Sequence, residues 1–449
     1  MLKEFKHTFK ISLPIIISNL AQIALGLIDS AMIGAVDYKQ LAAASLALNV
    51  IVIPQVAASG IAIAISPVTA MANGQNNTAK ASSILYNGFL LTLLVALFIS
   101  LTLILSERIL FHLGQDDEVA TYAAPFYKLM ALSMIPLLMF SAVKQFCDGL
   151  EFTKTAMILS LGSLPLNAFL NWIFIYGKFG VPRMELTGAG WGTLITRIVI
   201  AVVLMIVVLR HKTFKKYIEI SHSAWKVKAS IWKELLQVGI PTSLQYGMEV
   251  AAFAVSAIMI GWMGATSQAA HQIAISLATF TFMAALGLSM GGSIRIANAY
   301  GQNNHALVQA IGKSTFIGGL VYGVVCGIFF IIFRNQLPLL FTENAEVITL
   351  TSSLLIIAAI FQISDATQAI CVGMLRGIRD VKAPTLFVAI AYWAIGIPIG
   401  YILSFPLKMG ASGIWIGFVC GLTTSSVLLN RRFAKKSKLN SVNEGNLHL

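Results

Sequence analysis

Three carboxylates stand inside long apolar segments of this sequence, where a charge is costly: Asp29, Glu249 and Asp365. An ionised side chain at the centre of a membrane costs at least about 2.5–3.5 kcal/mol on insertion scales. Each carboxylate therefore needs a cation, a proton, a substrate or a basic side chain beside it. The structural interpretation is an internal ion pair with Lys128 or Arg197. The functional interpretation is an ion or proton relay, or a site for a cationic substrate.

Amide side chains in the same segments are candidates to support these acids. Asn167 and Asn171 are four residues apart, so on a helix they share one face. Two amides in an apolar helix need partners, and they can either bond Asp29, touch a substrate or tie helices together structurally. Weaker candidates of the same kind are Gln22, Gln245, Gln272 and Gln362. His271 is a candidate proton relay, with packing as the plainer interpretation of a lone histidine.

Composition excludes several classes of protein. Of the 449 residues, 57% are hydrophobic and only 11% are charged, whereas a soluble domain has about 25% charged residues. An ordinary soluble enzyme, a disordered chain and a disulfide scaffold are therefore excluded. The four cysteines form neither a CxxC nor a zinc spacing and are interpreted as core residues. The sequence has no GxxxxGK[ST] or HExxH motif, and no enzymatic activity is predicted.

The elements that must position these residues are membrane helices, each of which needs about 20 apolar residues. Twelve apolar segments meet that length, at residues 11–36, 41–72, 84–106, 120–144, 155–177, 187–210, 235–263, 267–298, 310–333, 346–375, 384–404 and 410–430. Lysine and arginine gather at both termini and in every second connection. The positive-inside rule therefore predicts that both termini lie in the cytoplasm. Topology also explains the net charge of +13, so no nucleic-acid partner is expected.

The two halves of the sequence resemble each other. With a shift of 227 residues, Gly74–Asn77 aligns with Gly301–Asn304, both reading Gly-Gln-Asn-Asn. Each repeat holds six segments, which predicts an all-α membrane protein of two six-helix bundles related by a pseudo-two-fold axis along the membrane normal. The expected division is an N-terminal bundle at 1–209, a basic cytoplasmic linker at 210–234, a C-terminal bundle at 235–430 and a tail at 431–449. Such a repeat favours a transporter over a channel.

Several short segments together resemble the multidrug and toxic compound extrusion family, in its bacterial NorM-type branch. The resemblance covers nearly the whole chain. The segments that carry it are Gly26–Gly34, Leu166–Asn167, Asn171–Gly180, Met248–Val250, Ala269–Gln272, Leu340–Thr342, Ser364–Ala366 and Leu375–Asp380.

The resemblance implies a multi-pass protein of the bacterial inner membrane that exports bulky cationic and aromatic compounds, driven by entry of Na⁺ or H⁺. Asp29 matches the family's N-lobe aspartate, and Glu249 and Asp365 match the C-lobe acids assigned to cation binding. We therefore expect Na⁺ at Glu249 and Asp365, with no other cofactor, and a monomer that works in contact with membrane lipid. Phe361 departs from the pattern, because some relatives carry a tyrosine there.

Two other classes of function remain open from the residues alone. A flippase for lipid-linked precursors has a related architecture, but a cleft for anionic pyrophosphate lipids should carry arginine and lysine, whereas the charges found in these segments are mainly acidic. An ion channel or an intramembrane enzyme is the other alternative, and electrophysiology would distinguish a channel from a carrier.

Overall fold

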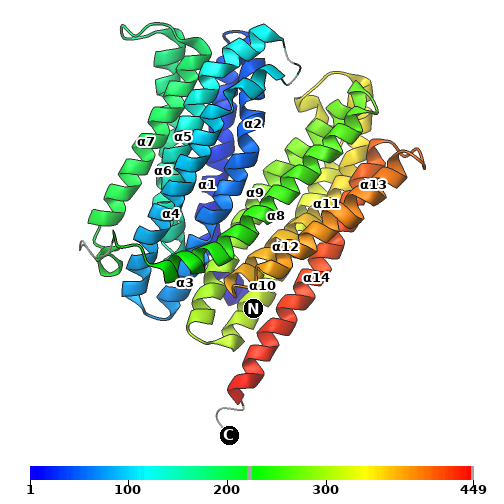
Figure 1. Ribbon diagram of the computed structural model, residues 1–449. Coiled ribbons are helices and arrows are strands. Elements are labelled where there is room, and N and C mark those ends of the chain that lie inside the picture. The colour runs from blue at the N-terminus through cyan, green and yellow to red at the C-terminus, as the bar shows by residue number, and fades with distance from the viewer. Residues whose placement is uncertain (113, 115, 220–224, 446–449) are drawn as a thin grey trace. The chain divides into compact units, whose positions relative to one another are not determined.

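The computed structural model describes residues 1–112, 114, 116–219 and 225–445, with side chains up to residue 438, and it is built from helices (Figure 1). The helices in chain order are α1 (Leu2–Gly34), α2 (Tyr38–Ile63), α3 (Ile65–Gly74), α4 (Thr78–Leu105), α5 (Asp117–Gly149), α6 (Thr153–Tyr176), α7 (Glu185–Arg210), α8 (Ala229–Gly261), α9 (Ala265–Gly301), α10 (His305–Ile332), α11 (Ala345–Gly377), α12 (Lys382–Ala389), α13 (Ile397–Ser404) and α14 (Ala411–Gly445). Short turns of helix are η1 (Glu107–His112), η2 (Lys215–Tyr217) and η4 (Leu337–Leu340), and η5 (Ile390–Gly396) is a π-helix that joins α12 to α13.

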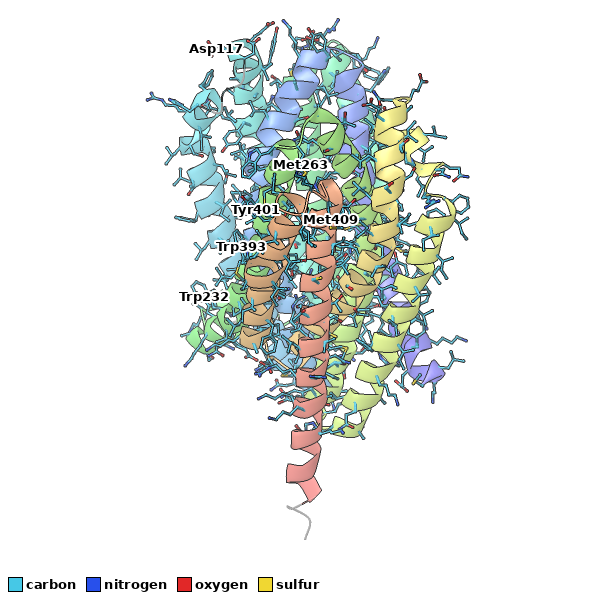
Figure 2. The ribbon with its side chains drawn as sticks, turned by 90° about the vertical axis from the view of Figure 1, so that its right-hand side faces the viewer. Asp117, Trp232, Met263, Trp393, Tyr401 and Met409 are labelled. Carbon is cyan, nitrogen blue, oxygen red and sulfur yellow. The ribbon has the colours of Figure 1, made fainter. Side chains whose placement is uncertain are left out.

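Within the described residues, twelve helical stretches are long and apolar enough to cross a membrane. The predicted all-α membrane fold is thereby confirmed. Two spans are composite: Tyr38–Gly74 unites α2 with α3, and Lys382–Ser404 unites α12, η5 and α13. Many large apolar side chains of these helices are exposed, as contact with lipid requires. Figure 2 shows Trp393 and Tyr401, both about half exposed, which project from η5 and α13.

The repeated Gly-Gln-Asn-Asn motif is a helix-to-helix turn in both halves. Asn76 and Asn303 adopt left-handed backbone angles, with φ of 52° and 56°, a conformation that asparagine tolerates better than most residues. The next asparagine caps the following helix: the side chain of Asn77 accepts from the backbone N–H of Lys80 at 2.8 Å, and that of Asn304 accepts from Leu307 at 3.0 Å. The motif therefore repeats because the same turn and cap are needed twice.

Contacts divide the chain into two compact units, Ile17–Ser243 and Met1–Ile16 with Leu244–Leu449. We call these the first unit and the second unit. The division falls inside α1 and inside α8, shortly after Pro14 and Pro241, which are repeat-equivalent prolines within these helices. The sequence boundaries at 1–209, 210–234, 235–430 and 431–449 describe the repeat and remain predictions. The contacts instead group the first turns of α1 with the later helices, and the first half of α8 with the earlier ones.

Each unit has a close helix crossing at a glycine, and the two glycines occupy equivalent positions in the repeat. A Cβ added at Gly60 of α2 would lie 2.5 Å from the backbone nitrogen of Ser243 on α8. The repeat-equivalent Gly287 of α9 faces Ile16 of α1, and a Cβ there would lie 2.5 Å from its Cγ1 and 3.0 Å from its backbone nitrogen. Small residues of this kind let membrane helices approach closely. The buried Arg295 of α9 adds an ion pair to Glu4 of α1 at 2.5 Å.

We expect Gly60→Ala and Gly287→Ala each to destabilise the protein, because the added methyl group collides with the neighbouring backbone. Overpacking of this kind costs about 1–3 kcal/mol. The measurement is the midpoint of thermal unfolding of the purified protein in detergent. Gly162→Ala on α6 is the matched control, because nothing lies within 4 Å of its added Cβ. Equal midpoints for all three variants would contradict the crossing geometry.

Candidate functional site

In the first unit, α1, α6 and α7 place a polar network around Asp29. The Asn171 side chain donates from Nδ2 to Asp29 Oδ1 at 2.6 Å, and Thr193 Oγ1 donates to Asp29 Oδ2 at 3.2 Å. Asn171 Nδ2 also lies 3.3 Å from Asn167 Oδ1, and Asn167 Nδ2 lies 3.5 Å from Thr193 Oγ1. Both oxygens of one carboxylate are therefore held by neutral donors on two other helices.

Close packing fixes the two asparagines in this network. The side chains of Asn167 and Asn171 are fully buried. A Cβ at Gly192 of α7 would lie 2.1 Å from Asn171 Oδ1, so only glycine leaves room for the amide there. The hydrogen bonds from Asn171 to Asp29 and Asn167 fulfil the expectation that the i, i+4 pair forms one polar face. Gln22, which is also on α1, has an exposed side chain.

A basic residue completes the surroundings of Asp29 without a direct bond to it. Arg197 of α7 donates from a terminal guanidinium nitrogen to Ser133 Oγ at 2.6 Å, and it lies near enough to Asp29 for an electrostatic attraction. The other basic partner considered for the three acids, Lys128, pairs with Glu107 at 2.8 Å. Asp29 is therefore held chiefly by neutral hydrogen-bond donors, with Arg197 as a more distant positive charge.

In the second unit, α8 and α11 surround Glu249 with amide donors. Gln245, one helical turn earlier on α8, donates to Glu249 Oε1 at 3.0 Å. Gln368 of α11 donates to the same oxygen at 3.3 Å. Asp365 lies on α11 one turn before Gln368, is 8% exposed, and is close enough to Glu249 for the two carboxylates to repel each other. The structure therefore brings together the two acids that the sequence assigns to one cation site.

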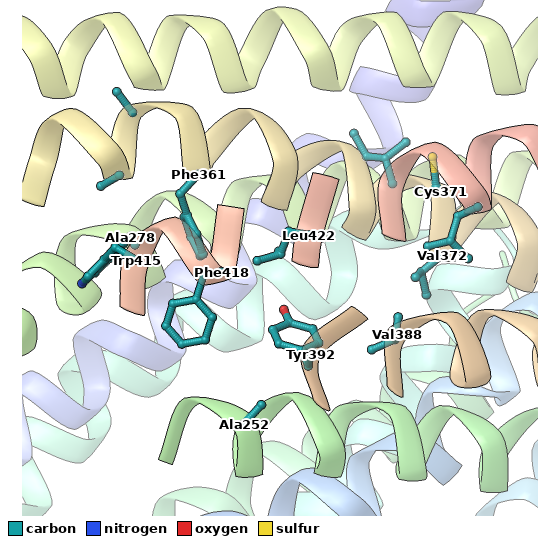
Figure 3. Close-up of a cluster of buried hydrophobic side chains, with 14 of the residues drawn as sticks. Ala252, Ala278, Phe361, Cys371, Val372, Val388, Tyr392, Trp415, Phe418 and Leu422 are labelled. Carbon is teal, nitrogen blue, oxygen red and sulfur yellow. The ribbon is translucent and has the colours of Figure 1, made fainter. Parts of the chain in front are cut away.

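The phenol of Tyr392 lies at the same site, although the sequence analysis did not single it out. Its ring comes from the π-helix η5, its hydroxyl hydrogen-bonds with Gln368, and it is within electrostatic range of both Glu249 and Asp365. Phe361, which departs from the tyrosine that the resemblance leads us to expect near Asp365, packs in an aromatic cluster with Trp415 at 5.3 Å between ring centroids. Figure 3 shows Phe361, Trp415, Phe418 and Tyr392 in this cluster. A π-helix is an irregularity often found at functional sites.

The remaining predicted residues divide between the core and the surface. His271 is 3% exposed and stacks edge-on against Trp415 with 5.9 Å between centroids. Gln362 is buried and accepts from Thr281 Oγ1 at 2.9 Å, whereas the side chain of Gln272 is exposed. Among the hydrogen bonds of the described residues, none joins these three side chains to Glu249 or Asp365. Their assigned support of the site stays a prediction.

A further carboxylate, that of Asp148, is buried although it lies outside the apolar segments that contain Asp29, Glu249 and Asp365. Asp148 is fully buried at the end of α5 and pairs with Lys144 at 2.8 Å. It was missed because the apolar run ends before it, while tertiary packing against α3 extends burial: a Cβ at the adjacent Gly149 would lie 2.5 Å from the carbonyl oxygen of Ser66. Since its lysine neutralises it within one helical turn, this acid is a structural ion pair.

Comparison with known proteins gives a consistent result. The family model described as MatE matches residues 14–173 and 241–402, once in each half of the chain. The multidrug resistance protein NorM of Vibrio cholerae serotype O1 is 31% identical over 435 residues, covering 96% of this chain and 95% of that protein. The multidrug resistance protein MdtK of Yersinia pseudotuberculosis serotype O:1b is 31% identical over 431 residues, covering 95% of this chain and 94% of that protein.

Solved structures share the fold. The crystal structure of the eukaryotic MATE transporter AtDTX14 superposes with a TM-score of 0.88 at 22% identity, covering 98% of both chains. A crystal structure of MATE in the bent conformation superposes with a TM-score of 0.90 at 20% identity, covering 98% of this chain and 97% of the other.

Proposed function

This chain belongs to the MatE family of multidrug transporters, and from that membership we propose that it is a secondary active antiporter. It exports cationic and aromatic organic compounds in exchange for Na⁺ by alternating access. The observation that carries the coupling proposal is the pair of the half-buried Glu249 and the buried Asp365, which lie together among oxygen and amide groups of α8, α11 and η5. Protons as the coupling ion are the alternative, with Asp29 as the carrier.

The chemistry of the second-unit site supports Na⁺. Two ionised carboxylates at close range in a medium of low dielectric repel strongly, and a bound cation removes that repulsion. Hard cations prefer oxygen ligands, and the site offers carboxylate oxygens from Glu249 and Asp365 with the hydroxyl oxygen of Tyr392 nearby. No group of three or more His, Cys, Asp or Glu side chains suited to a metal occurs in the described part of the chain. Two acids with neutral oxygen and amide groups around them support a small, hard cation such as Na⁺.

The first-unit site supports a separate role for Asp29. Its oxygens accept from an amide and a hydroxyl on neighbouring helices, an arrangement that holds the charged form in place. A cationic drug or a proton that neutralises the carboxylate weakens these bonds and loosens α1 from α6 and α7. Asp29 therefore serves as a substrate contact or a proton relay, with Asn167 and Asn171 as its positioning residues.

The twelve spans and the bacterial relatives support a place in the bacterial inner membrane, and the positive-inside rule predicts that both termini lie in the cytoplasm. It functions as a monomer, because its two repeats supply one complete pathway. A lipid-linked precursor flippase is the second candidate function, favoured by the half-buried Arg197 and the buried Arg295 and Arg376. Each of these guanidinium groups is engaged inside its own unit, with Ser133, Glu4 and Tyr246 respectively, so the drug antiporter is preferred.

The test is ethidium efflux from proteoliposomes or everted vesicles, with an imposed Na⁺ gradient compared with an imposed pH gradient. Efflux driven by Na⁺ alone is the expected result. Efflux driven by the pH gradient alone and lost in Asp29→Asn would transfer coupling to the first unit. No efflux under either gradient would overturn the drug-antiporter proposal and favour the flippase function instead.

A change of one hydroxyl tests the part played by Tyr392. We expect Tyr392→Phe to raise the Na⁺ concentration needed for efflux by about fivefold, because the hydrogen bond lost with Gln368 contributes roughly 1 kcal/mol. The measurement is the Na⁺ concentration that gives half-maximal efflux. Tyr401→Phe, on the adjoining α13 and about half exposed, is the control. An unchanged Na⁺ requirement in Tyr392→Phe would remove this tyrosine from the site.

A further inference from the structure

A buried arginine lies in the same unit as the proposed Na⁺ site. Arg376, in the last turn of α11, is 3% exposed. It donates from Nη2 to the hydroxyl oxygen of Tyr246 on α8 at 3.3 Å, and its guanidinium carbon lies 5.6 Å from the centre of that ring. Its Nε has no hydrogen-bond partner in the described part of the chain. Buried charges in proteins are normally paired, so a neutral phenol alone does not explain an arginine here.

The repeat-equivalent position in the first unit carries an ion pair within one helix. With a shift of 228 residues, Asp148 aligns with Arg376, and Asp148 is paired at 2.8 Å with Lys144, one turn earlier on α5. Val372 stands where Lys144 stands. The second unit therefore has a buried charge at the equivalent position, of opposite sign, but no counter-ion one turn before it.

Glu249 is within electrostatic range of Arg376. It follows Tyr246 by three residues on α8, so the two share one face of that helix. Both amide donors at the site bond Oε1 of Glu249, and no hydrogen bond from the residues that the structure describes reaches its Oε2. Asp380, one turn after Arg376, instead accepts from Arg432 through both oxygens, at 2.7 and 3.1 Å. The charge of Arg376 is therefore directed to Glu249 rather than to Asp380.

Arg376 changes the charge of the second-unit site. Ionised Glu249 and Asp365 carry two negative charges, and the guanidinium offsets one of them. What remains is the charge that a single monovalent cation neutralises. Because like charges repel strongly in a medium of low dielectric, the guanidinium also opposes the entry of Na⁺ and favours its release.

We propose that Arg376 is a positioning residue that sets the Na⁺ affinity of this site. It acts as a fixed counter-charge to Glu249, and its hydrogen bond to Tyr246 holds the guanidinium back from the carboxylate. This role rests on the proposed Na⁺ antiport, to which it adds the group that keeps Na⁺ from binding too tightly to be released. The same charge allows two acids to stand together when no ion is bound, since an uncompensated buried charge is strongly destabilising.

Equilibrium binding of ²²Na⁺ to the purified full-length protein in detergent tests the proposal. Arg376→Gln should bind Na⁺ at least about tenfold more tightly, because an opposing charge is removed, and misfolding cannot produce such a gain. Tyr246→Phe should bind Na⁺ at least about threefold more weakly, because the guanidinium loses its acceptor and moves toward Glu249. This weakening should vanish when Arg376→Gln is also present.

Two further variants control for loss of charge and for structural effects. Lys382→Gln removes an exposed positive charge at the start of α12 and should bind Na⁺ as wild type does. Arg376→Lys keeps the charge and should bind Na⁺ less tightly than Arg376→Gln. Unchanged Na⁺ affinity in Arg376→Gln, together with a lower unfolding midpoint, would show that the arginine only stabilises the end of α11, and the proposal would be wrong.

A double-mutant cycle in Na⁺-free buffer distinguishes the role of Arg376 from the antiport itself. Unfolding midpoints are compared for wild type, Arg376→Gln, Glu249→Gln and the double variant. The double variant should lose less than the sum of the two single losses, because each single variant leaves one charge uncompensated. Additive losses would overturn the pairing of Arg376 with Glu249 even where Na⁺ drives efflux. Coupled losses in a protein that binds no ²²Na⁺ would overturn the Na⁺ antiport and leave the pair with a structural role alone.

Discussion

Glu249→Gln and Asp365→Asn are each expected to abolish Na⁺-driven efflux while the protein remains folded. Each substitution removes one of two charged ligands from a buried site, a change that costs about 3 kcal/mol or more, equivalent to at least about a hundredfold loss of Na⁺ affinity. Folding is preserved because the carboxamide of Gln or Asn has nearly the same size and shape as the carboxylate that it replaces. The measurement is ethidium efflux under an imposed Na⁺ gradient, with direct binding of ²²Na⁺ to the purified protein.

Glu346→Gln is the matched control for these two variants. It removes a carboxylate from α11, the helix that carries Asp365, but from an exposed first turn. Its efflux and Na⁺ binding should equal those of wild type. Na⁺-driven efflux at the wild-type rate in both Glu249→Gln and Asp365→Asn would contradict the assignment of Na⁺ to this pair. The coupling ion would then have to bind elsewhere.

Asp29→Asn is expected to reduce drug efflux by at least about tenfold while leaving ²²Na⁺ binding unchanged. The carboxylate accepts from Asn171 and Thr193, and the new amide would turn an NH₂ group toward one of these donors. An unmatched donor pair in a buried network costs about 1–3 kcal/mol. Efflux and Na⁺ binding are measured on the same preparations, so the two sites are assessed independently.

Asp117→Asn, at the exposed start of α5, is the control for charge loss in the first unit. It should transport as wild type does. A loss of Na⁺ binding in Asp29→Asn would show that the two sites are not separate. Efflux at the wild-type rate in Asp29→Asn would instead show that transport requires neither substrate binding nor proton transfer by this carboxylate.

Much of the architecture was readable from the sequence, because span length and hydropathy are local properties. Twelve apolar segments become twelve spanning stretches among the residues that the structure describes, and the Gly-Gln-Asn-Asn repeat becomes the same capped turn in both halves. The pair Asn167 and Asn171 follows the same logic, since residues four apart on a helix must share a face. The acids Asp29, Glu249 and Asp365 indicated both candidate sites for a similar reason. The cost of an ionised side chain can be judged from the apolar segment in which it lies.

Only the tertiary structure decided which side chains complete each site. No sequence motif around Thr193 or Gln368 predicts that either residue takes part in a site. Tyr392 lies in a π-helix, which the local sequence does not predict. Their partners are distant in sequence, so hydropathy and spacing carry no information about them. Asp148 was missed likewise, because packing of neighbouring helices extended burial beyond its own apolar run.

The grouping of α1 and α8 was also beyond the sequence. The apolar composition of these two helices does not specify which helices pack against them. The close approach of Gly60 to Ser243 and of Gly287 to Ile16 depends on the size of the side chains on both helices of each crossing. For this protein, local physical chemistry determined the helices, the repeat and the acids, and packing between helices determined the partners of those acids.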